Sequence, residues 1–278
     1  MGSGMATRLI AAGHSVSVYN RNPARSAPFA ELGAKVAGSP RAAAERADVI
    51  VGMTADDESS RNLWLGEFGA LAADNLPDAL AIECSTLSHD WVLELSAKVR
   101  DRGFRYVDAP VTGLPDAAAA GTLTLLVGAD PADLDAARPI FASLATRVLH
   151  FGGVGQGTAY KLMVNLMGAV QIASAAEGIA LAERAGLDLR LVADAVASGQ
   201  AASPQVVRNV RRFVAGDHGG VNFTPALRLK DVDYALRLAR KLGIRCPFGE
   251  VASEVYRRLC ESGFALDNES RVIDVMRR

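Results

Sequence analysis

The stretch GGVGQGTAYKLMVN, residues 152–165, divides the chain into two halves of different character. Before it, short apolar runs alternate with helical patterns, which is typical of a parallel, doubly wound α/β sheet. After its last glycine, residues 158–185 form one apolar segment without proline, and this predicts a long helix that is buried on most sides. We therefore predict an α/β domain over residues 1–155 and an all-α domain over residues 156–278, with the long helix as the interdomain element.

Composition argues against several classes of protein. The chain has 278 residues, 50% of them hydrophobic, and a formal net charge of −1, so we expect neither nucleic acid nor an anionic membrane as a partner. Its three cysteines and four histidines have no metal-ligand or framework spacing, which predicts no metal site and no disulfide scaffold. No uninterrupted apolar run reaches the roughly 18 residues of a membrane span, and no signal-peptide pattern is present. We expect a reduced, cytoplasmic protein.

The N-terminal segments have the pattern of a dinucleotide-binding fold. A helical pattern over residues 4–12 ends at Gly13, and a strand over residues 15–19 ends in a polar turn. In such folds an acidic residue after this strand binds the ribose of NAD, whereas Arg accommodates the 2′-phosphate of NADP. The chain has Asn20 and Arg21 there and no carboxylate, which favours NADP over NAD; an ordinary solvated Arg in a turn is the alternative.

The phosphate-binding loop of this fold normally follows a first strand and contains three glycines. Here the pattern begins at MGSGMA, residues 1–6, with Gly2 in the place of the third glycine. We therefore expect the first strand and the first two glycines to be missing. One alternative follows from this expectation: a short chain that binds no cofactor and acts only as an interaction or structural module.

Two loops after predicted strands carry hydroxyl groups. The segment ECSTLS, residues 83–88, follows a strand, and hydroxyls at the carboxyl end of a parallel sheet can bind a ligand, although helix capping would use the same residues. The segment DAPVTGL, residues 108–114, has Pro and Gly around a hydroxyl. Such a tight loop exposes backbone N–H groups that can bind a carboxylate without a formal positive charge, and an ordinary turn is the simpler interpretation.

Lys161 and Asn165 are four residues apart on the predicted long helix, so they share one of its faces. A lysine on a helix is more often a solvated surface charge, but this helix is otherwise apolar. In a partly desolvated cleft the pKa of a lysine falls from about 10.4 toward neutrality. A lysine of that kind suits general acid/base catalysis between an alcohol and a carbonyl, and Asn165 could donate a hydrogen bond to the substrate oxygen.

Together these motifs resemble those of the β-hydroxyacid dehydrogenases, which include 3-hydroxyisobutyrate dehydrogenases, tartronate semialdehyde reductases and glyoxylate/succinic semialdehyde reductases. The resemblance covers almost the whole chain. The matched patterns are G-L-G-x-M-G-x-x-M-A (residues 1–6, from its first M onward), GH before a strand and NR (13–21), ADVI with Met53 (47–53), D-x-S-T-x-S-P (83–89), D-A-P-V-S-G-G (108–114), G-x-G-x-x-x-K with Asn four residues later (155–165), and F-x-x-x-L-x-x-K-D (223–231).

The resemblance implies a Rossmann-like NAD(P)-binding domain and hydride transfer between NADP or NAD and a small β-hydroxy acid or semialdehyde. It implies that Lys161 transfers the proton, that Asn165 orients the oxygen, and that Asp231 is structural or orients a lysine. The implied substrate loop is Thr112, Gly113 and Leu114, and the implied cofactor contacts are Gly2, Asn20, Arg21, Met53, Thr86 and Lys230. Leu114 stands where the family has a second glycine, which predicts an altered pocket and leaves the substrate unnamed.

Two relatives with other functions share this scaffold. Imine reductases and the non-catalytic modules of certain chromatin proteins typically replace the catalytic lysine, so Lys161 argues against both. The long apolar helix predicts a homodimer or homotetramer, because so apolar a surface favours packing against a second copy.

Overall fold

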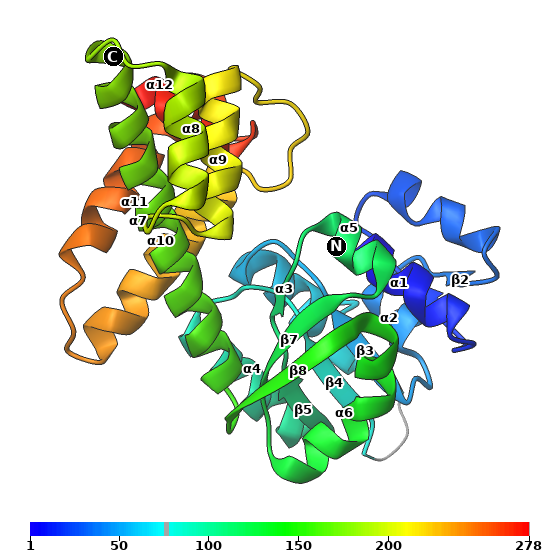
Figure 1. Cartoon of the computed structure of the whole chain (residues 1–278). Coiled ribbons are helices and arrows are strands. Elements are labelled where there is room, and N and C mark those ends of the chain that lie inside the picture. The colour runs from blue at the N-terminus through cyan, green and yellow to red at the C-terminus, as the bar shows by residue number, and fades with distance from the viewer. Residues whose placement is uncertain (75–77, 278) are drawn as a thin grey trace. The chain divides into compact units, whose positions relative to one another are not determined.

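The computed structural model describes residues 1–74 and 78–277 of the chain. They form two compact units, Met1–Lys161 and Leu162–Arg278, called unit 1 and unit 2 below. The predicted boundary lay at residues 155 and 156, six residues earlier. The difference arises because helix α7 (Gln156–Arg184) continues without a break from one unit into the other (Figure 1).

Unit 1 contains a six-stranded sheet in which β3, β4 and β5 are parallel neighbours, in the order β3-β4-β5-β7-β6, with β8 parallel to β7. The predicted parallel arrangement holds for β3, β4 and β5, whereas β7 runs antiparallel to β5 and β6. The connection from β6 to β7, residues 113–122, is shorter than the dozen or so residues that a parallel crossover needs. The strands are β3 (Val49–Gly52), β4 (Leu80–Glu83), β5 (Arg105–Asp108), β6 (Val111–Thr112), β7 (Leu123–Gly128) and β8 (Ala145–Gly152).

A second, two-stranded sheet lies in the N-terminal part of unit 1. Its strands, β1 (Ser17–Val18) and β2 (Lys35–Val36), pair with each other in parallel. In the doubly wound order the first strand lies between the second and fourth. Within the described ranges 1–74 and 78–277, no strand joins β1 to β3, so unit 1 contains two separate sheets.

Helices cover both faces of the larger sheet. Leu80 and Ile82 of β4 belong to a core formed with α1 and α6, whereas the intervening Ala81 belongs to a core that contains Trp64 and Trp91. This alternation is the two-residue period of a strand whose faces are both buried. The helices of unit 1 are α1 (Gly2–Ala11), α2 (Pro40–Ala44), α3 (Asp57–Leu65), α4 (His89–Asp101), α5 (Pro115–Ala120) and α6 (Pro131–Leu144), with 3₁₀ turns at Pro23–Arg25, Ala27–Ala30 and Ala70–Ala72.

Unit 2 consists of helices and their connections in its described residues, with no strand among them, as the sequence predicts. Its core joins Ile172 of α7 to Phe213, Val232 and Tyr256 from three other helices. The helix starts carry clear local signals: Ser203 and Thr224 accept hydrogen bonds from backbone N–H groups three residues later, and each is followed by proline. The helices are α8 (Leu189–Ser198), α9 (Pro204–Ala215), α10 (Pro225–Lys241), α11 (Pro247–Leu259) and α12 (Val272–Met276), with a π-helical turn at Cys260–Phe264 and a 3₁₀ turn at Glu269–Arg271.

Helix α7 has the length and composition of a membrane span, and among the described residues no other helix does. Its most apolar window has a mean hydropathy of 1.3, and 39% of that window is buried inside the structure. The expectation of no such segment rested on the lack of an uninterrupted apolar run, but Asn165 and Glu177 interrupt this helix without making it polar on average. Core helices of soluble proteins pass the same test, and Ile172 and Ile179 lie in the core of unit 2.

Candidate active site

Hydroxyl groups gather at the carboxyl ends of β3 and β4. The Ser85 hydroxyl accepts a hydrogen bond of 2.6 Å from the backbone N–H of Thr54, and the two side-chain oxygens are 3.1 Å apart. The predicted residue Thr86 follows Ser85 and is half-buried. Thr54 and Ser85 were not predicted as site residues. The sequence does indicate them in one way: each is a hydroxyl residue close to the carboxyl end of a strand, where doubly wound folds bind ligands.

Glu83, at the end of β4, is a buried carboxylate that organises this edge of the sheet. It accepts hydrogen bonds from Ser60 Oγ at 2.8 Å, from Trp64 Nε1 at 2.8 Å and from the backbone N–H of Ser85 at 2.9 Å. These donors take the place of solvent for a carboxylate that is 1% exposed. Glu83 therefore fixes the start of the loop that carries Thr86, a role that the sequence alone did not indicate.

Helix α1 begins close to the end of β3. A Cβ placed on Gly2 would lie 3.6 Å from Met53 Cβ, so two of the predicted cofactor residues are neighbours. The helix starts without a side-chain cap, and no acidic residue lies in its first turn. Uncapped N–H groups and the positive end of the helix dipole favour an anion such as a phosphate. The start of α1 therefore fits the phosphates of a dinucleotide.

Arg21 lies in the turn that follows β1 and is exposed to solvent. The neighbouring Asn20 stabilises this turn, because its side-chain oxygen accepts a hydrogen bond of 2.9 Å from the backbone N–H of Asn22. No carboxylate stands between Tyr19 and Asn22. This turn therefore offers a cation and no anion where a dinucleotide fold receives the adenosine ribose.

The predicted substrate loop connects β6 to α5. Thr112 pairs with Thr124 of β7 and its side chain is exposed, whereas Leu114 is half-buried at the start of α5. Gly113 has φ 138°, and a Cβ there would lie 2.8 Å from Leu123 Cδ2. Only glycine fits such a position, both for its backbone angle and for lack of space. The loop therefore turns at a position that favours glycine, directly after the exposed Thr112.

Asp108, at the end of β5, holds the glycine loop that precedes Lys161. Its carboxylate accepts hydrogen bonds from the N–H of Gly155 at 2.6 Å, from the N–H of Thr158 at 2.8 Å and from Thr158 Oγ1 at 3.0 Å. Burial raises the pKa of Asp108 to about 6, although these hydrogen bonds favour the charged form. Asp108 therefore caps the start of α7, and it was missed as a site residue although it opens the DAP motif.

His89 also touches this loop. It stands at the first position of α4, where the resembled family has proline, and a Cβ placed on Gly155 would lie 2.9 Å from His89 Nε2. The imidazole therefore packs directly on the backbone that leads into α7.

Lys161 and Asn165 lie on successive turns of α7, as predicted from their spacing. Lys161 is half-buried and follows Thr158 by three residues, at the end of unit 1. Asn165 is 9% exposed and belongs to unit 2, where its amide Nδ2 donates a hydrogen bond of 2.6 Å to Asp231 Oδ2. A charged carboxylate only accepts hydrogen bonds, so the nitrogen of the amide must face Asp231. The second N–H of Asn165 points away from this contact.

Asp231 also pairs with the predicted cofactor residue Lys230. The Lys230 ammonium lies 3.1 Å from Asp231 Oδ1, and it is 5.3 Å from the centre of the Tyr234 ring. The two oxygens of Asp231 thus contact an amide and an ammonium. The ion pair supports the interpretation of Asp231 as a lysine-orienting residue, whereas its contact with Asn165 was not foreseen.

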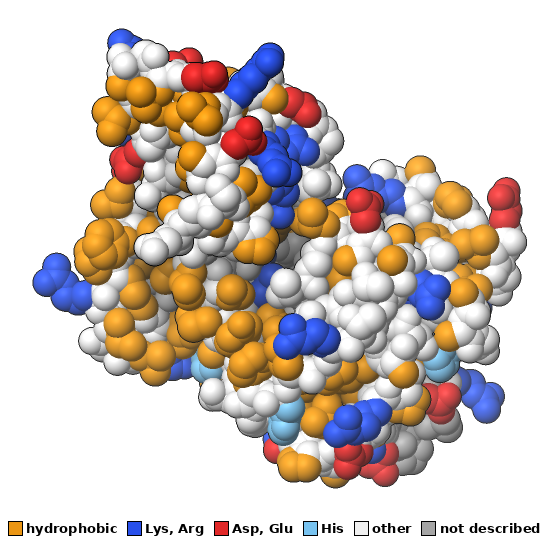
Figure 2. Space-filling view, viewed as in Figure 1, with side chains coloured by type: hydrophobic (Ala, Val, Ile, Leu, Met, Phe, Trp, Pro, Cys, Tyr) orange, Lys and Arg blue, Asp and Glu red, His pale blue; other side chains and the backbone are white. Residues whose placement is uncertain are grey.

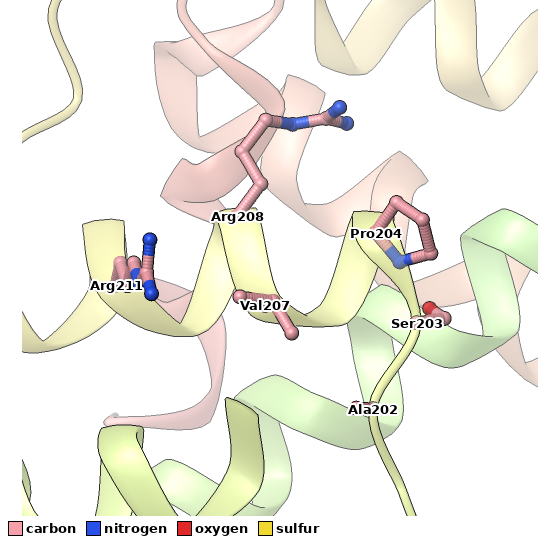
Figure 3. Close-up of a pocket in the computed structure, with 6 residues that line it drawn as sticks. All are labelled: Ala202, Ser203, Pro204, Val207, Arg208 and Arg211. Atoms are coloured by element: carbon pink, nitrogen blue, oxygen red, sulfur yellow. The ribbon is translucent and has the colours of Figure 1, made fainter. Parts of the chain in front are cut away.

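Unit 2 contains a shallow hollow of ≈ 590 Å³ at the start of α9 (Figure 3). Arg208 and Arg211 border it, and their side chains leave α9 in different directions. None of the predicted site residues lines this hollow. Among residues 1–74 and 78–277, no group of three or more His, Cys, Asp or Glu side chains is placed to hold a metal ion.

Two protein families match consecutive parts of the chain. The NAD-binding domain of 6-phosphogluconate dehydrogenase matches residues 1–153. The NAD-binding domain of NADP-dependent 3-hydroxyisobutyrate dehydrogenase matches residues 155–276. The two matches together cover nearly all of the chain, and they meet at the glycine loop before Lys161.

Individual proteins show the same relationship. The NAD-dependent L-serine dehydrogenase of Pseudomonas aeruginosa is 32% identical over 274 residues, which span 95% of this chain and 91% of that protein. The structure of 3-hydroxyisobutyrate dehydrogenase from Mycobacterium tuberculosis with L-serine is 31% identical, with a TM-score of 0.89, and covers 100% of this chain and 96% of its own. An imine reductase from Pseudomonas sp. is more distant: it is 20% identical, has a TM-score of 0.58, covers 99% of this chain and 96% of its own, and shares the fold alone.

Proposed function

The chain belongs to the β-hydroxyacid dehydrogenase family and is an NAD(P)-dependent oxidoreductase, and from this premise we propose that it interconverts a small β-hydroxy acid and its semialdehyde with NADP as cofactor. The observation that carries the proposal is the pair Lys161 and Asn165 on one face of α7, directly after a loop that Asp108 holds. Imine reductases resemble the chain in fold only, so the reduction of imines is the weaker alternative.

The proposed chemistry divides between the cofactor and the side chains. When bound, the nicotinamide exchanges a hydride with the carbinol carbon of the substrate. In the oxidative direction the Lys161 amine accepts the hydroxyl proton, and in the reductive direction the Lys161 ammonium returns it. The free N–H of Asn165 donates to the reacting oxygen, which keeps this oxygen oriented toward the lysine. Thr112 and the backbone at Gly113 hold the substrate carboxylate.

Arg21 supports NADP as the preferred cofactor. Its guanidinium can bind a 2′-phosphate, and the absence of a carboxylate between Tyr19 and Asn22 leaves the ribose of NAD without its usual acceptor. The start of α1 at Gly2 would receive the pyrophosphate. The remaining proposed cofactor contacts are Asn20, Met53, Thr86 and Lys230.

The substrate class follows from the loop and from the relatives. Relatives of this chain are named for L-serine and for 3-hydroxyisobutyrate, which are both small β-hydroxy acids. Leu114 places an apolar side chain beside the loop that we assign to the carboxylate. This favours a substrate with a small apolar substituent over one with a second charge.

A kinetic comparison tests the proposal. Purified protein is assayed with NADP and NAD against 3-hydroxyisobutyrate, L-serine and a cyclic imine, and the same panel is run with Lys161→Ala. We expect turnover of a β-hydroxy acid, and the substitution should lower kcat by about 10²-fold or more while the Kd of the cofactor changes little. Near-normal turnover in Lys161→Ala, or turnover of the imine alone, would contradict the proposal.

We further propose a homodimer in the cytoplasm, with neither a membrane nor a nucleic acid as partner. The support for a dimer is a group of exposed apolar side chains in unit 2: Met163 and Met167 on α7, and Phe248 and Val251 on α11. The two helices meet, because a Cβ on Gly249 would lie 2.8 Å from Leu166 Cδ1. Figure 2 shows hydrophobic side chains gathered over this part of unit 2. A patch of this kind on a soluble protein typically marks an interface.

A further inference from the structure

A buried arginine lies beside Asn165. Arg228, on α10, is 4% exposed, and its guanidinium donates a hydrogen bond of 3.3 Å to the backbone carbonyl of Asn165. The same group donates from Nε to Glu269 Oε2 at 2.8 Å, and its NH2 lies 2.7 Å from that oxygen. Phe223 stacks on the guanidinium, with 4.5 Å from Arg228 Cζ to the ring centre. The planar fork of arginine therefore makes contacts in three directions at once.

The burial of this ion pair calls for a physical explanation. Burial opposes the charge of Arg228, but Glu269, together with Tyr256 and Asp231, outweighs that effect and raises the pKa of the guanidinium. Buried pairs of this kind contribute little net stability, because the cost of removing both charges from water is close to their attraction. What such a pair provides is a fixed geometry, since each of its hydrogen bonds has a required direction.

Asn165 is held at two points by one helix. Asp231 accepts a hydrogen bond from its side-chain amide, and Arg228, three residues earlier on α10, donates to its backbone carbonyl. The first contact sets the rotation of the amide about its bonds. The second contact sets the position of the α7 backbone at this residue. Together, the two contacts fix the direction in which the free amide N–H of Asn165 points.

Glu269, the partner of Arg228, belongs to the C-terminal segment and is itself held in place there. Glu269 is 3% exposed, and its backbone N–H donates a hydrogen bond of 2.9 Å to the carbonyl of Phe223. Its other carboxylate oxygen lies 3.5 Å from Arg208 NH2 on α9. The chain of contacts thus runs from α9 and the C-terminal turn through Glu269 and Arg228 to Asn165.

We propose that Arg228 and Glu269 are positioning residues of the reaction: they act through Asn165 and fix the direction in which its amide meets the substrate oxygen. The inference rests on the proposed function, in which Asn165 touches the reacting oxygen. Arg228 and Glu269 contact neither substrate nor cofactor in this scheme. Their loss therefore affects the chemical step and leaves the binding of NADP unchanged.

A double-mutant cycle tests the inference. Arg228→Lys keeps the positive charge but removes the planar guanidinium, which can donate hydrogen bonds in several directions. The substitution is made alone and together with Asn165→Ala. We expect Arg228→Lys to lower kcat by about tenfold, with the KM for NADP within about twofold of the wild type. In the Asn165→Ala background, Arg228→Lys should change kcat no further. Arg211→Lys, the same substitution at an exposed arginine of α9, serves as the control and should keep wild-type kinetics.

Three outcomes overturn the inference in distinguishable ways. If Arg228→Lys lowers kcat equally in both backgrounds, Arg228 acts through general stability and only the positioning role fails. If Asn165→Ala itself retains wild-type turnover, the role of Asn165 in the proposed function fails as well. Should Arg228→Lys not fold, as judged by its circular dichroism, Glu269→Gln replaces it in the cycle, because it keeps the shape and an acceptor for Arg228. An additive effect of Glu269→Gln then refutes the positioning role.

Discussion

Lys161 lies one turn beyond the residues that Asp108 holds in place. Gly155 and Thr158 both donate to the buried carboxylate, and Thr158 precedes the lysine by three residues on the same helix. A cap of this kind satisfies N–H groups that the first turn of a helix leaves without partners. The direction of the lysine side chain therefore depends on a contact between the end of β5 and the start of α7.

The buried carboxylate of Asp108 should make stability depend on pH. Burial raises its pKa to about 6 in the folded state, against 3.8 as the ordinary value, so the folded state binds more protons in this window. This contribution to stability is therefore fully present below about pH 4 and is lost as the pH rises through about 6, by at most about 3 kcal/mol. Asparagine at this position cannot ionise.

We expect the free energy of unfolding of the wild type, relative to that of Asp108→Asn, to fall between pH 4 and pH 7. Urea unfolding at several pH values measures both proteins, and the difference between them cancels the titration of other carboxylates. Parallel curves for the two proteins across this range would show that Asp108 has an ordinary pKa.

Arg21 offers a separate test of cofactor choice. Arg21→Ala removes the cation that we assign to the 2′-phosphate, and we expect it to weaken the binding of NADPH by about tenfold or more while the Kd of NADH changes little. Fluorescence titration with each cofactor measures both constants. Arg25→Ala, a nearby exposed arginine on the following turn, is the matched control. An equal loss of affinity for the two cofactors would show that Arg21 does not bind the 2′-phosphate.

Among the elements, α1 and α5 pack more closely than two ordinary helices. A Cβ on Gly4 would lie 2.7 Å from the backbone nitrogen of Ala119 and 3.1 Å from Ala118 Cβ. The start of α1 is the proposed phosphate site, and α5 follows the proposed substrate loop. Their close contact therefore couples the two loops within unit 1.

Gly4→Ala should disturb this packing. Because a backbone atom stands in the way, we expect the substitution to lower the free energy of unfolding by about 1–3 kcal/mol. Gly178→Ala is the control, since Gly178 lies within α7 and an added Cβ there would meet no atom within 4 Å beyond the local helix backbone. Gly178→Ala should raise the free energy of unfolding by about 0.5–1 kcal/mol. Thermal unfolding compares the two, and a stabilising effect of Gly4→Ala would refute the close contact.

The strand order illustrates how far elements can be predicted. Strands β3, β4, β5 and β7 each contain a short apolar run, and such a run predicts a strand from the sequence alone. The antiparallel direction of β7 does not follow from the sequence, because it depends on how the connection through α5 returns the chain to the sheet. Strand β6 has only two residues, too few to show the alternation of a strand.

For the whole molecule, the exposed apolar group on α7 and α11 decides the expected assembly. Phe248 is 76% exposed, which is costly for a side chain of this size in water. Phe248→Asp should therefore convert the proposed dimer into a monomer. Light scattering coupled to gel filtration measures the mass, and Leu266→Asp, at an exposed leucine of unit 2 outside this apolar group, is the control. A wild type that is monomeric at micromolar concentration would contradict the dimer.

The sequence by itself determined the features that depend on neighbours along the chain. The starts of α9 and α10 follow from Ser203 and Thr224 with the prolines after them, and the shared face of Lys161 and Asn165 follows from helical spacing. The family, and with it the fold class, follows from motifs that are each short and continuous. Such features form within a few residues, where the hydrogen-bonding geometry leaves few alternatives.

Only the tertiary structure decided which polar groups meet. Asp108 contacts Thr158 across 50 residues, and Asn165 contacts Asp231 across 66. Arg228 and Glu269, 41 residues apart, carried no signal in the sequence, because a charged residue in a helical pattern is usually solvated. Burial removes the water that would otherwise satisfy these groups, so they must find partners wherever the packing of sheet and helices brings them.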